Sequence, residues 1–201
     1  MRKIVVFMMV SLDGVMQAPG GRKEDPSEGF KFGGWTAPYS DEAMGHILKK
    51  ELSLPFDLLL GKKTYDMWAG YWSKQKGFIA DPFNICTKYV VSNKKADLPW
   101  KEAVLITGDV AAKLKALKKE DGPVFHVWGS HVLIQTLLKN DLVDELRLRI
   151  YPITLGEGKK LFAGGTIPAA FKLEDCKALQ SGIILANYKR AGKVKTGNVG
   201  E

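Results

Sequence analysis

The stretch DLLLGKKTY, residues 57–65, is an apolar segment that runs into a glycine, two lysines and a threonine where a helical pattern begins. Glycine at such a junction lets the backbone approach a ligand closely, and the free amides at the start of the helix can face a phosphate. Lys62 and Lys63 add positive charge beside those amides. The junction therefore predicts an anion site, although a structural turn with two solvated lysines has the same sequence.

A second junction of this kind occurs at residues 123–130, PVFHVWGS, where an apolar strand pattern ends in glycine and serine before another helical pattern. Ligands of sheet-based domains collect outside the carboxyl ends of the strands, so two such junctions could hold two ends of one nucleotide. Neither junction contains the GxGxxG fingerprint. Its absence argues against the ordinary dinucleotide-binding fold, but not against a dinucleotide ligand.

The order of strand and helix patterns predicts an α/β protein with a single domain over residues 1–191. The continuous apolar run Ile4–Val10 suits a central strand covered on both faces. Strand patterns then alternate with helical ones, which predicts a largely parallel sheet. The strand segments are residues 57–60, 89–94, 103–107 and 123–128, and the helical segments lie near residues 63–70 and 110–119.

Toward the C-terminus the pattern changes and predicts antiparallel pairing. Residues 145–151 alternate with period two, and residues 171–179 and 182–189 form a predicted hairpin. We therefore expect a mixed sheet. The segment 192–201 has too few apolar side chains to pack and is predicted to be a flexible tail.

A long loop is predicted between the first strand and the first helix. Residues 17–38 are rich in glycine, proline and charge, and a loop of this length inside a compact domain is usually functional or disordered. Ser40 has the chemistry of an N-cap for the following helix, with Asp41 and Glu42 in its first turn.

Composition limits the classes of partner. The chain has 201 residues and a formal charge of +8, but its lysines are scattered and form no stripe interleaved with aromatic residues. This distribution favours a small phosphorylated ligand over nucleic acid. The cysteines and histidines lack metal-ligand spacing, so no metal site is expected. The N-terminal apolar run is too short to span a bilayer, which predicts a cytoplasmic protein with no membrane partner.

Five motifs give the chain a resemblance to a known family. In chain order they are SLDG at 11–14, GKKTY at 61–65, VS at 91–92, VWGS at 127–130 and PITLGEGKKLF at 152–162. Over residues 4–189 the chain resembles the dihydrofolate reductase-like superfamily, and more closely the branch related to the C-terminal reductase domain of the bifunctional riboflavin-biosynthesis deaminase-reductase. The resemblance implies a three-layer fold, with helices on both faces of a mixed, mostly parallel central sheet and a C-terminal antiparallel hairpin.

The resemblance also implies an NADPH-dependent reductase and supplies its cofactor residues. They are Gly61, Lys62, Lys63 and Thr64 at the phosphates, Ser92, Asn93 and Lys94 near the adenosine 2′-phosphate, and Gly129 and Ser130 at the pyrophosphate. Lysines there suit NADPH over NADH, because the additional phosphate carries roughly two negative charges. Lys62 stands where the family commonly has arginine, and it lacks the bidentate geometry of that side chain.

The implied chemistry is hydride transfer to a polarised C=N or C=O bond of a pteridine, a ribosylaminopyrimidine or a related small heterocycle. Asp13, just after the first strand, is a candidate proton donor, and its alternative is a turn aspartate bonded to its own backbone. Asp41 and Glu42 are further candidates, because dihydrofolate reductases keep a carboxylate on the helix after the first loop. Both are equally explained as acids in the first turn of a helix.

Several other residues are candidates for the substrate pocket. Trp35, Tyr39, Tyr65 and Trp68 could stack on a flat heterocycle, although aromatic residues near helices are more often part of the core. Arg149 could bind a substrate phosphate or carboxylate, or it could point to the other face of the sheet as a solvated charge.

Two other functions remain open at the level of sequence. One is a non-catalytic nucleotide-binding protein of the same fold that has lost the proton donor, and the other is a basic nucleic-acid-binding protein. The chain contains no H-x-E motif with a downstream C-x-x-C, so a zinc deaminase half is missing from it. The relatives suggest a homodimer, for which an exposed apolar strand near residues 145–155 could supply the contact.

Overall fold

The computed structural model describes residues 1–200, which form one mixed sheet of eight strands in the order β4-β3-β2-β5-β1-β6-β8-β7. The six strands from β4 to β6 pair in parallel, and β8 and β7 are added to β6 in antiparallel orientation. The strands are β1 (Ile4–Ser11), β2 (Phe56–Gly61), β3 (Lys88–Val91), β4 (Ala103–Ile106), β5 (Val124–Trp128), β6 (Glu145–Tyr151), β7 (Ala170–Ala178) and β8 (Ile184–Gly192). The predicted mixed sheet and C-terminal hairpin are confirmed.

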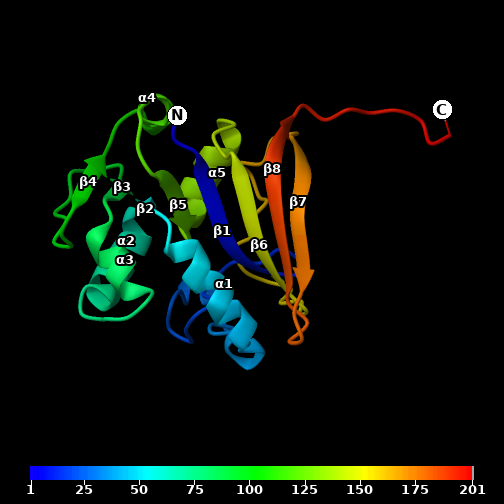
Figure 1. Ribbon diagram of the computed structural model, residues 1–201, viewed down its shortest axis with the longest axis horizontal. Coiled ribbons are helices and arrows are strands. Elements are labelled where there is room, and N and C mark those ends of the chain that lie inside the picture. Colours follow the sequence, from blue (N-terminus) through cyan, green and yellow to red (C-terminus); the bar gives the residue numbers. More distant parts are fainter. Residues whose placement is uncertain (201) are drawn as a thin grey trace.

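Helices cover both faces of the sheet (Figure 1). The helices are α1 (Glu42–Leu52), α2 (Lys62–Trp72), α3 (Ala80–Ile85), α4 (Val110–Lys119) and α5 (His131–Lys139), with short 3-10 turns at Ser27–Gly29 and Ala37–Tyr39. One core cluster packs α4 and α5 against β1, and another packs α1, α2 and α3 against β2. The three-layer arrangement implied by the resemblance is confirmed, whereas α3 was not predicted from the sequence.

Strand β1 lies at the centre because both of its faces are apolar. Ile4, Val6, Met8 and Val10 are buried on the side of α4 and α5. Phe7 is 1% exposed and contacts aromatic rings of β5. This is the burial expected for a strand covered on both faces.

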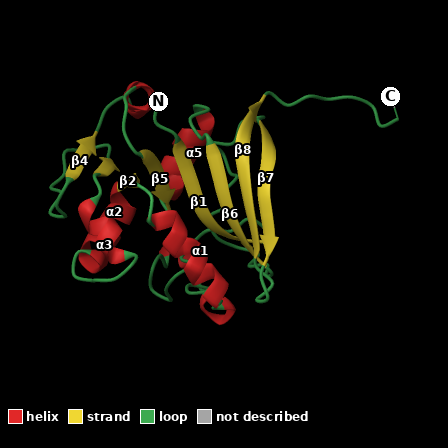
Figure 2. Ribbon diagram, in the orientation of Figure 1, coloured by secondary structure: helices red, strands yellow, loops and turns green. Residues whose placement is uncertain are grey.

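Two local predictions are wrong. The N-cap of α1 is Asp41, whose carboxylate accepts a hydrogen bond of 2.8 Å from the Ala43 amide, and Ser40 lies before it. Strand β6, at residues 145–151, pairs with β1 on one side and β8 on the other and has no exposed residue, so it is not the exposed strand expected near residues 145–155. The exposed edge near the C-terminus is β7, and Figure 2 shows β8 and β7 at the end of the sheet away from the helices.

The tail begins later than predicted, because β8 extends through Gly192. Residues 193–200 contain no helix or strand and extend away from the sheet (Figure 1). The last residue of the predicted tail, Glu201, lies outside the described residues. Among the described residues, no helix is long and apolar enough to cross a bilayer.

Candidate functional site

The two strand-to-helix junctions lie side by side and are bonded to each other. Strands β2 and β5 are parallel neighbours, so α2 and α5 begin at the same edge of the sheet. The Gly61 amide donates a hydrogen bond of 2.9 Å to Ser130 Oγ, and the Ser130 amide donates one of 3.1 Å to Thr64 Oγ1. We call this pair of bonds the clasp. These two hydrogen bonds hold the two junctions in a fixed position relative to each other.

The backbone at the second junction is left-handed at two successive residues. Gly129 has φ of 57° and Ser130 has φ of 58°. Helix α5 begins directly after these residues, and its free N-terminal amides and positive dipole end can face an anion. Glycine adopts this φ without cost, whereas serine is strained there and is held in place by the clasp.

A cavity of about 1070 Å³ lies against the clasp. Its wall contains all nine residues predicted to hold the cofactor, namely Gly61, Lys62, Lys63, Thr64, Ser92, Asn93, Lys94, Gly129 and Ser130. These residues come from three separate strand ends and meet in one place. Such a cleft at the carboxyl ends of parallel strands is where ligands of open α/β sheets bind.

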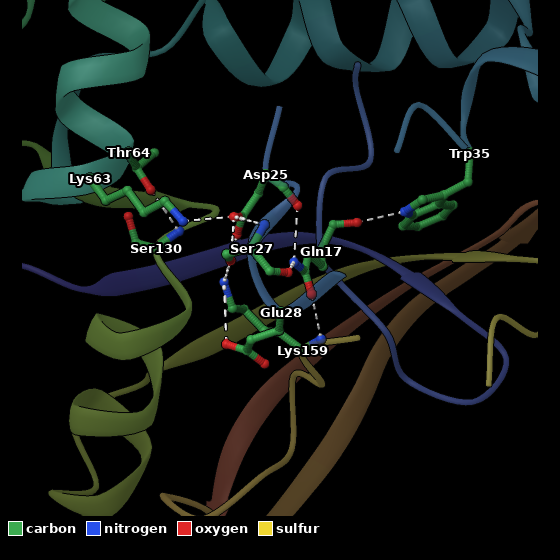
Figure 3. Close-up of polar contacts among 9 residues, drawn as sticks. All are labelled: Gln17, Asp25, Ser27, Glu28, Trp35, Lys63, Thr64, Ser130 and Lys159. Carbon is green, nitrogen blue, oxygen red and sulfur yellow. Dashed lines mark hydrogen bonds and ion pairs between the residues drawn. The ribbon is translucent and has the colours of Figure 1, made fainter. Parts of the chain in front are cut away.

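Two lysines of the first turn of α2 already have acidic partners. Lys62 Nζ lies 2.7 Å from Asp66 on the next turn of the helix. Lys63 Nζ lies 2.7 Å from Asp25, which belongs to the loop after β1 (Figure 3). Both carboxylates are monovalent, so a phosphate can compete with them for these lysines.

The segment 16–29, which we call the cavity loop, is held by a polar network around Asp25 (Figure 3). The Asp25 carboxylate accepts bonds from Lys63, Lys159 and Ser27. Partial burial would raise the pKa of Asp25, but the hydrogen bonds from Lys159, Lys63 and Ser27 outweigh it and hold the pKa well below its usual value. Gln17 Nε2 also donates to the Asp25 carbonyl, at 3.0 Å. Asp25 is therefore an ionised anchor of the loop.

Glu24 is a cavity residue that the sequence reasoning missed. Its Oε2 accepts hydrogen bonds from the amides of Gly20, at 2.6 Å, and Gly21, at 3.1 Å, and burial raises the pKa of its carboxyl group. No hydrogen bond to its second oxygen, Oε1, was found within residues 1–200. The only signal in the sequence was an acidic pair inside a loop rich in glycine and proline.

His131 is a second missed residue of the cavity wall, at the start of α5. Burial lowers the pKa of its imidazole, so the ring is neutral near pH 7. Its buried Nε2 has no hydrogen-bond partner in the part of the chain that the structure describes. The histidine therefore adds a polar but uncharged group to the wall beside Ser130.

Asp13 lies outside the cavity wall. Its carboxylate accepts bonds from the Ser11 hydroxyl, at 2.6 Å, and from the amides of Leu155, at 3.1 Å, and Gly156, at 2.9 Å. The bond from Ser11 is the main cause of a lowered pKa. A carboxylate with these partners joins two loops, and its placement does not support proton donation into the cavity.

Asp41 is also absent from the cavity wall. It caps α1, and its second oxygen lies 3.3 Å from the Ser181 amide. Hydrogen bonding to Ser181 lowers the pKa of the carboxyl group. The alternative considered for this residue, an acid that stabilises a helix start, fits its position.

Of the four aromatic residues predicted to contact substrate, Trp68 alone is among the residues that line the cavity. Tyr65 is fully buried, and its hydroxyl accepts a bond of 2.8 Å from the Trp100 amide. Trp35 is buried and donates from its indole to the Gln17 carbonyl at 2.8 Å (Figure 3). Tyr39 is half-buried and packs edge-on against the core residue Tyr151. The positions of these three residues fit the alternative that aromatic residues near helices belong to the core.

Arg149 is buried beneath α1 and absent from the cavity wall. Its guanidinium forms an ion pair with Glu51 of α1. It lies 5.3 Å from the ring centre of Phe7 and 5.5 Å from that of Trp128, and both of these rings line the cavity. The arginine is therefore adjacent to the wall but separated from a ligand by its own partners.

Comparison with known proteins identifies the chain. The family model for the RibD C-terminal domain matches residues 2–185. The chain belongs to the RibD C-terminal domain family. In this chain, the two junctions of the clasp are the motifs GKKTY and VWGS.

Relatives of this RibD C-terminal domain extend over nearly its whole length. It is 27% identical over 200 residues to the uncharacterized protein YyaP of Bacillus subtilis strain 168, which covers 93% of this chain and 94% of that protein.

Solved structures show the same fold. A pyrimidine reductase-like protein from Corynebacterium diphtheriae has a TM-score of 0.65 at 14% identity, covering 94% of this chain and 92% of that one. Dihydrofolate reductase from Enterococcus faecalis, complexed with NADP(H) and RAB-propyl, has a TM-score of 0.59 at 14% identity, covering 94% and 96%. The fold is dihydrofolate reductase-like, and the family supports a reductase-type function.

Proposed function

We propose that this protein is an NADPH-dependent reductase that transfers hydride to a pteridine, a ribosylaminopyrimidine or a related small heterocycle. The observation that carries the proposal is the clasp, which joins two helix N-termini at one cavity of about 1070 Å³. A dinucleotide has phosphates in its middle and a ring at each end. It therefore suits a single cavity whose wall contains the starts of two helices.

The residues present fit this cofactor chemically. The start of α5, directly after the left-handed pair Gly129 and Ser130, offers its helix amides and positive dipole end to a pyrophosphate. Lys62 and Lys63 of the α2 N-terminus and Lys94 after β3 are in the same wall. Three lysines are more than one pyrophosphate needs, which favours a ligand with a further phosphate and hence NADPH over NADH.

When bound, the dihydronicotinamide ring would supply the hydride. The chain's own residues orient the two reactants and supply the proton. We propose Glu24 as the proton donor, because it is a cavity-wall carboxyl group with a raised pKa and because its Oε1 accepts no hydrogen bond from residues 1–200. Asp25 is less suitable, since hydrogen bonds from two lysines and a serine keep it ionised.

The proposal is tested by titrating the protein with NADPH and NADH at fixed salt and following thermal unfolding. A ligand at a hundredfold excess over its dissociation constant adds about 2.7 kcal/mol to stability, which is readily measured. We expect a larger shift with NADPH than with NADH, and a smaller NADPH shift in Lys62→Ala and Lys94→Ala. Lys139→Ala, at the far end of α5, is the control and should behave as wild type. No shift with either nucleotide would rule out the proposal.

We further propose that the protein acts as a homodimer in the cytoplasm. Strand β7 is an unpaired edge, and its residues from Lys172 to Ala178 are exposed. Such an edge is a template for pairing with another strand. Light scattering after gel filtration measures the mass of the particle. If β7 forms the contact, Leu173→Pro should convert the dimer to a monomer. A wild-type monomer at all concentrations contradicts this proposal.

A further inference from the structure

Helix α2 changes character along the face that lines the cavity. Its first turn contributes Lys62, Lys63 and Thr64, and its later turns contribute Met67, Trp68, Tyr71 and Trp72. The lining positions recur every three to four residues, as on one face of a helix. Lys63 and Trp72 are nine residues apart, which corresponds to about 14 Å along the helix axis. One end of this face is cationic and the other is aromatic.

The aromatic end of α2 is a packed cluster, which we call the aromatic wall: Trp68, Tyr71, Trp72 and Phe83. Trp68 stacks on Phe83 of α3, with ring centres 4.9 Å apart and an angle of 19°. Trp72 meets Phe83 edge-on at 5.6 Å, and Tyr71 meets Trp72 edge-on at 4.9 Å. Tyr71 nevertheless keeps 56% of its surface exposed. A large exposed ring beside a cavity is a candidate contact for an apolar ligand.

A second pair of rings lines the same cavity from the sheet. Phe7 of β1 and Trp128 of β5 stack with centres 4.5 Å apart and an angle of 11°. Leu48 of α1 and Met9 of β1 add aliphatic and thioether surface to the wall. The cavity therefore presents aromatic faces from both the helices and the sheet.

Charged groups are confined to the remainder of the cavity. Within the described residues, the charged side chains and the histidine in its wall belong to the cavity loop, the first turn of α2, the β3 exit, the start of α5 or Lys159. The two arginines that lie over the Phe7 ring, Arg147 and Arg149, are not part of the cavity wall. Arg149 is 3% exposed and neutralised by Glu51. Freeing it for a ligand would leave a buried carboxylate without its partner.

We infer that the hydride acceptor of the proposed reductase is an uncharged, flat heteroaromatic compound, bound against the aromatic wall, and that compounds carrying a phosphate are disfavoured. This inference rests on the proposed function and narrows its substrate class. A phosphate carries roughly two negative charges, and burying it at an end without a cation is costly. A flat ring, by contrast, gains contact with aromatic faces.

The reaction balances with the cofactor as the only reductant. Hydride passes to the carbon of a C=N or C=O bond of the acceptor, and a proton passes to its nitrogen or oxygen. NADPH leaves as NADP⁺. No charged group on the acceptor is needed for this step, so an uncharged ring is sufficient as a substrate.

The test uses a matched pair of probes, riboflavin and its 5′-phosphate FMN, which share one flat ring system and differ by a phosphate. Lumazine serves as a smaller uncharged ring. Binding is measured by fluorescence with the full-length protein saturated with NADP⁺, so that no turnover occurs. We expect saturable binding of riboflavin or lumazine, with riboflavin bound at least about tenfold more tightly than FMN.

Variants then locate the ligand. Tyr71→Ala should weaken riboflavin binding several-fold, and Tyr71→Phe, which keeps the ring, should restore most of it. Phe78→Ala is the matched control, because Phe78 is a 46% exposed aromatic residue that is absent from the cavity wall. Lys63→Ala should weaken the binding of NADP⁺ and leave the binding of riboflavin unchanged. Tyr71 and Phe78 are both largely exposed, so we expect truncation of either to leave the fold intact, and unfolding curves check this.

The outcomes separate the inference from the proposed function. If NADPH binds but FMN binds as well as riboflavin, or phosphoribosylaminouracil is turned over faster than the uncharged rings, the inference fails and the reductase stands. If NADPH binds and neither riboflavin nor lumazine does, the inference fails too. Riboflavin binding without any NADPH binding overturns the hydride-acceptor role and the proposed function together.

Discussion

Lys63 and Asp25 form an ion pair, with Nζ 2.7 Å from Oδ1, that ties the first turn of α2 to the cavity loop. The lysine is 70% exposed at its side chain, whereas Asp25 is 19% exposed and also bonded to Lys159. Asp25 therefore keeps an anchor when Lys63 turns to another anion. The pair allows a phosphate to recruit Lys63 without releasing the loop.

Asp25→Asn should lower the free energy of unfolding by about 1–2 kcal/mol at neutral pH, because charge-assisted hydrogen bonds to Lys159 and Lys63 are lost. Urea denaturation measures this. Asp66→Asn is the control, since its pair with Lys62 is exposed and contributes at most about 0.5 kcal/mol. Equal losses in the two variants would contradict the anchoring role.

The same substitution predicts a pH dependence. A carboxyl group whose folded-state pKa is depressed stabilises the fold above its unfolded pKa, and this stability is lost as pH falls through the folded pKa. The difference between wild type and Asp25→Asn should therefore be constant above about pH 4 and should shrink at lower pH. Denaturation curves at several acidic pH values check it. A difference that grows on acidification would be evidence against the depressed pKa.

Glu24→Gln should lower the rate of NADPH oxidation about a hundredfold or more with an accepted substrate, while NADPH binding is unchanged. A general acid works in its protonated form, so the wild-type rate should fall as pH rises through the Glu24 pKa, which burial raises. This decrease of the rate with rising pH should be absent in Glu24→Gln. Asp13→Asn is the control variant, and its rate should stay within a few-fold of the wild-type rate. An unchanged rate in Glu24→Gln excludes it as the donor.

Glu24→Gln should not destabilise the folded protein. Because the folded pKa is raised, the ionised carboxylate is disfavoured in the folded state, and stability is lost as pH rises through that pKa. A neutral amide removes this cost, so the variant should be as stable as wild type or more stable at pH 7. Thermal unfolding measures it, and a large loss would indicate a structural role instead.

Replacing Ser130 tests the clasp. Ser130→Ala removes the acceptor of the Gly61 amide and should destabilise the fold by about 1–3 kcal/mol. Ser130→Gly removes the same acceptor but suits the φ of 58°, so it should cost less than alanine by about 1 kcal/mol. Urea denaturation compares the two variants. An identical loss would mean that the left-handed backbone is not maintained in solution.

The buried pair of Arg149 and Glu51 should show strong coupling. Glu51→Gln leaves a buried guanidinium without its charge partner and should destabilise the fold by about 3–5 kcal/mol. The double variant Glu51→Gln with Arg149→Met should recover part of this loss. A double-mutant cycle measured by denaturation gives the coupling, and additive losses would show that the two side chains act independently.

The sequence predicted the two junctions correctly because their information is local. An apolar run, a glycine and a helical pattern define each of them, and the parallel order of β2 and β5 brings them together. The phase of a helix is harder to predict. Tyr65 and Trp68 are both plausible pocket residues on α2, yet Tyr65 faces the core and Trp68 the cavity. That choice depends on how the whole helix is rotated against the sheet.

The positions of Asp13 and Glu24 were hard to predict for a different reason. The partners of Asp13 include Leu155 and Gly156, more than a hundred residues away, and no local pattern indicates that contact. Glu24 lies in an irregular loop, where side chains follow no periodicity that could point it toward a cavity. Both cases depend on tertiary pairing between loops, which composition and spacing do not encode.

Helix α2 carries cationic residues at one end of its cavity face and aromatic residues at the other, about 14 Å away. Substitutions in its last two turns can therefore alter which compound is accepted while the nucleotide-facing turn stays intact. Within a family that shares this scaffold, new substrates can arise by drift at a few positions around Met67 and Tyr71. The cofactor end of the helix remains under separate constraint.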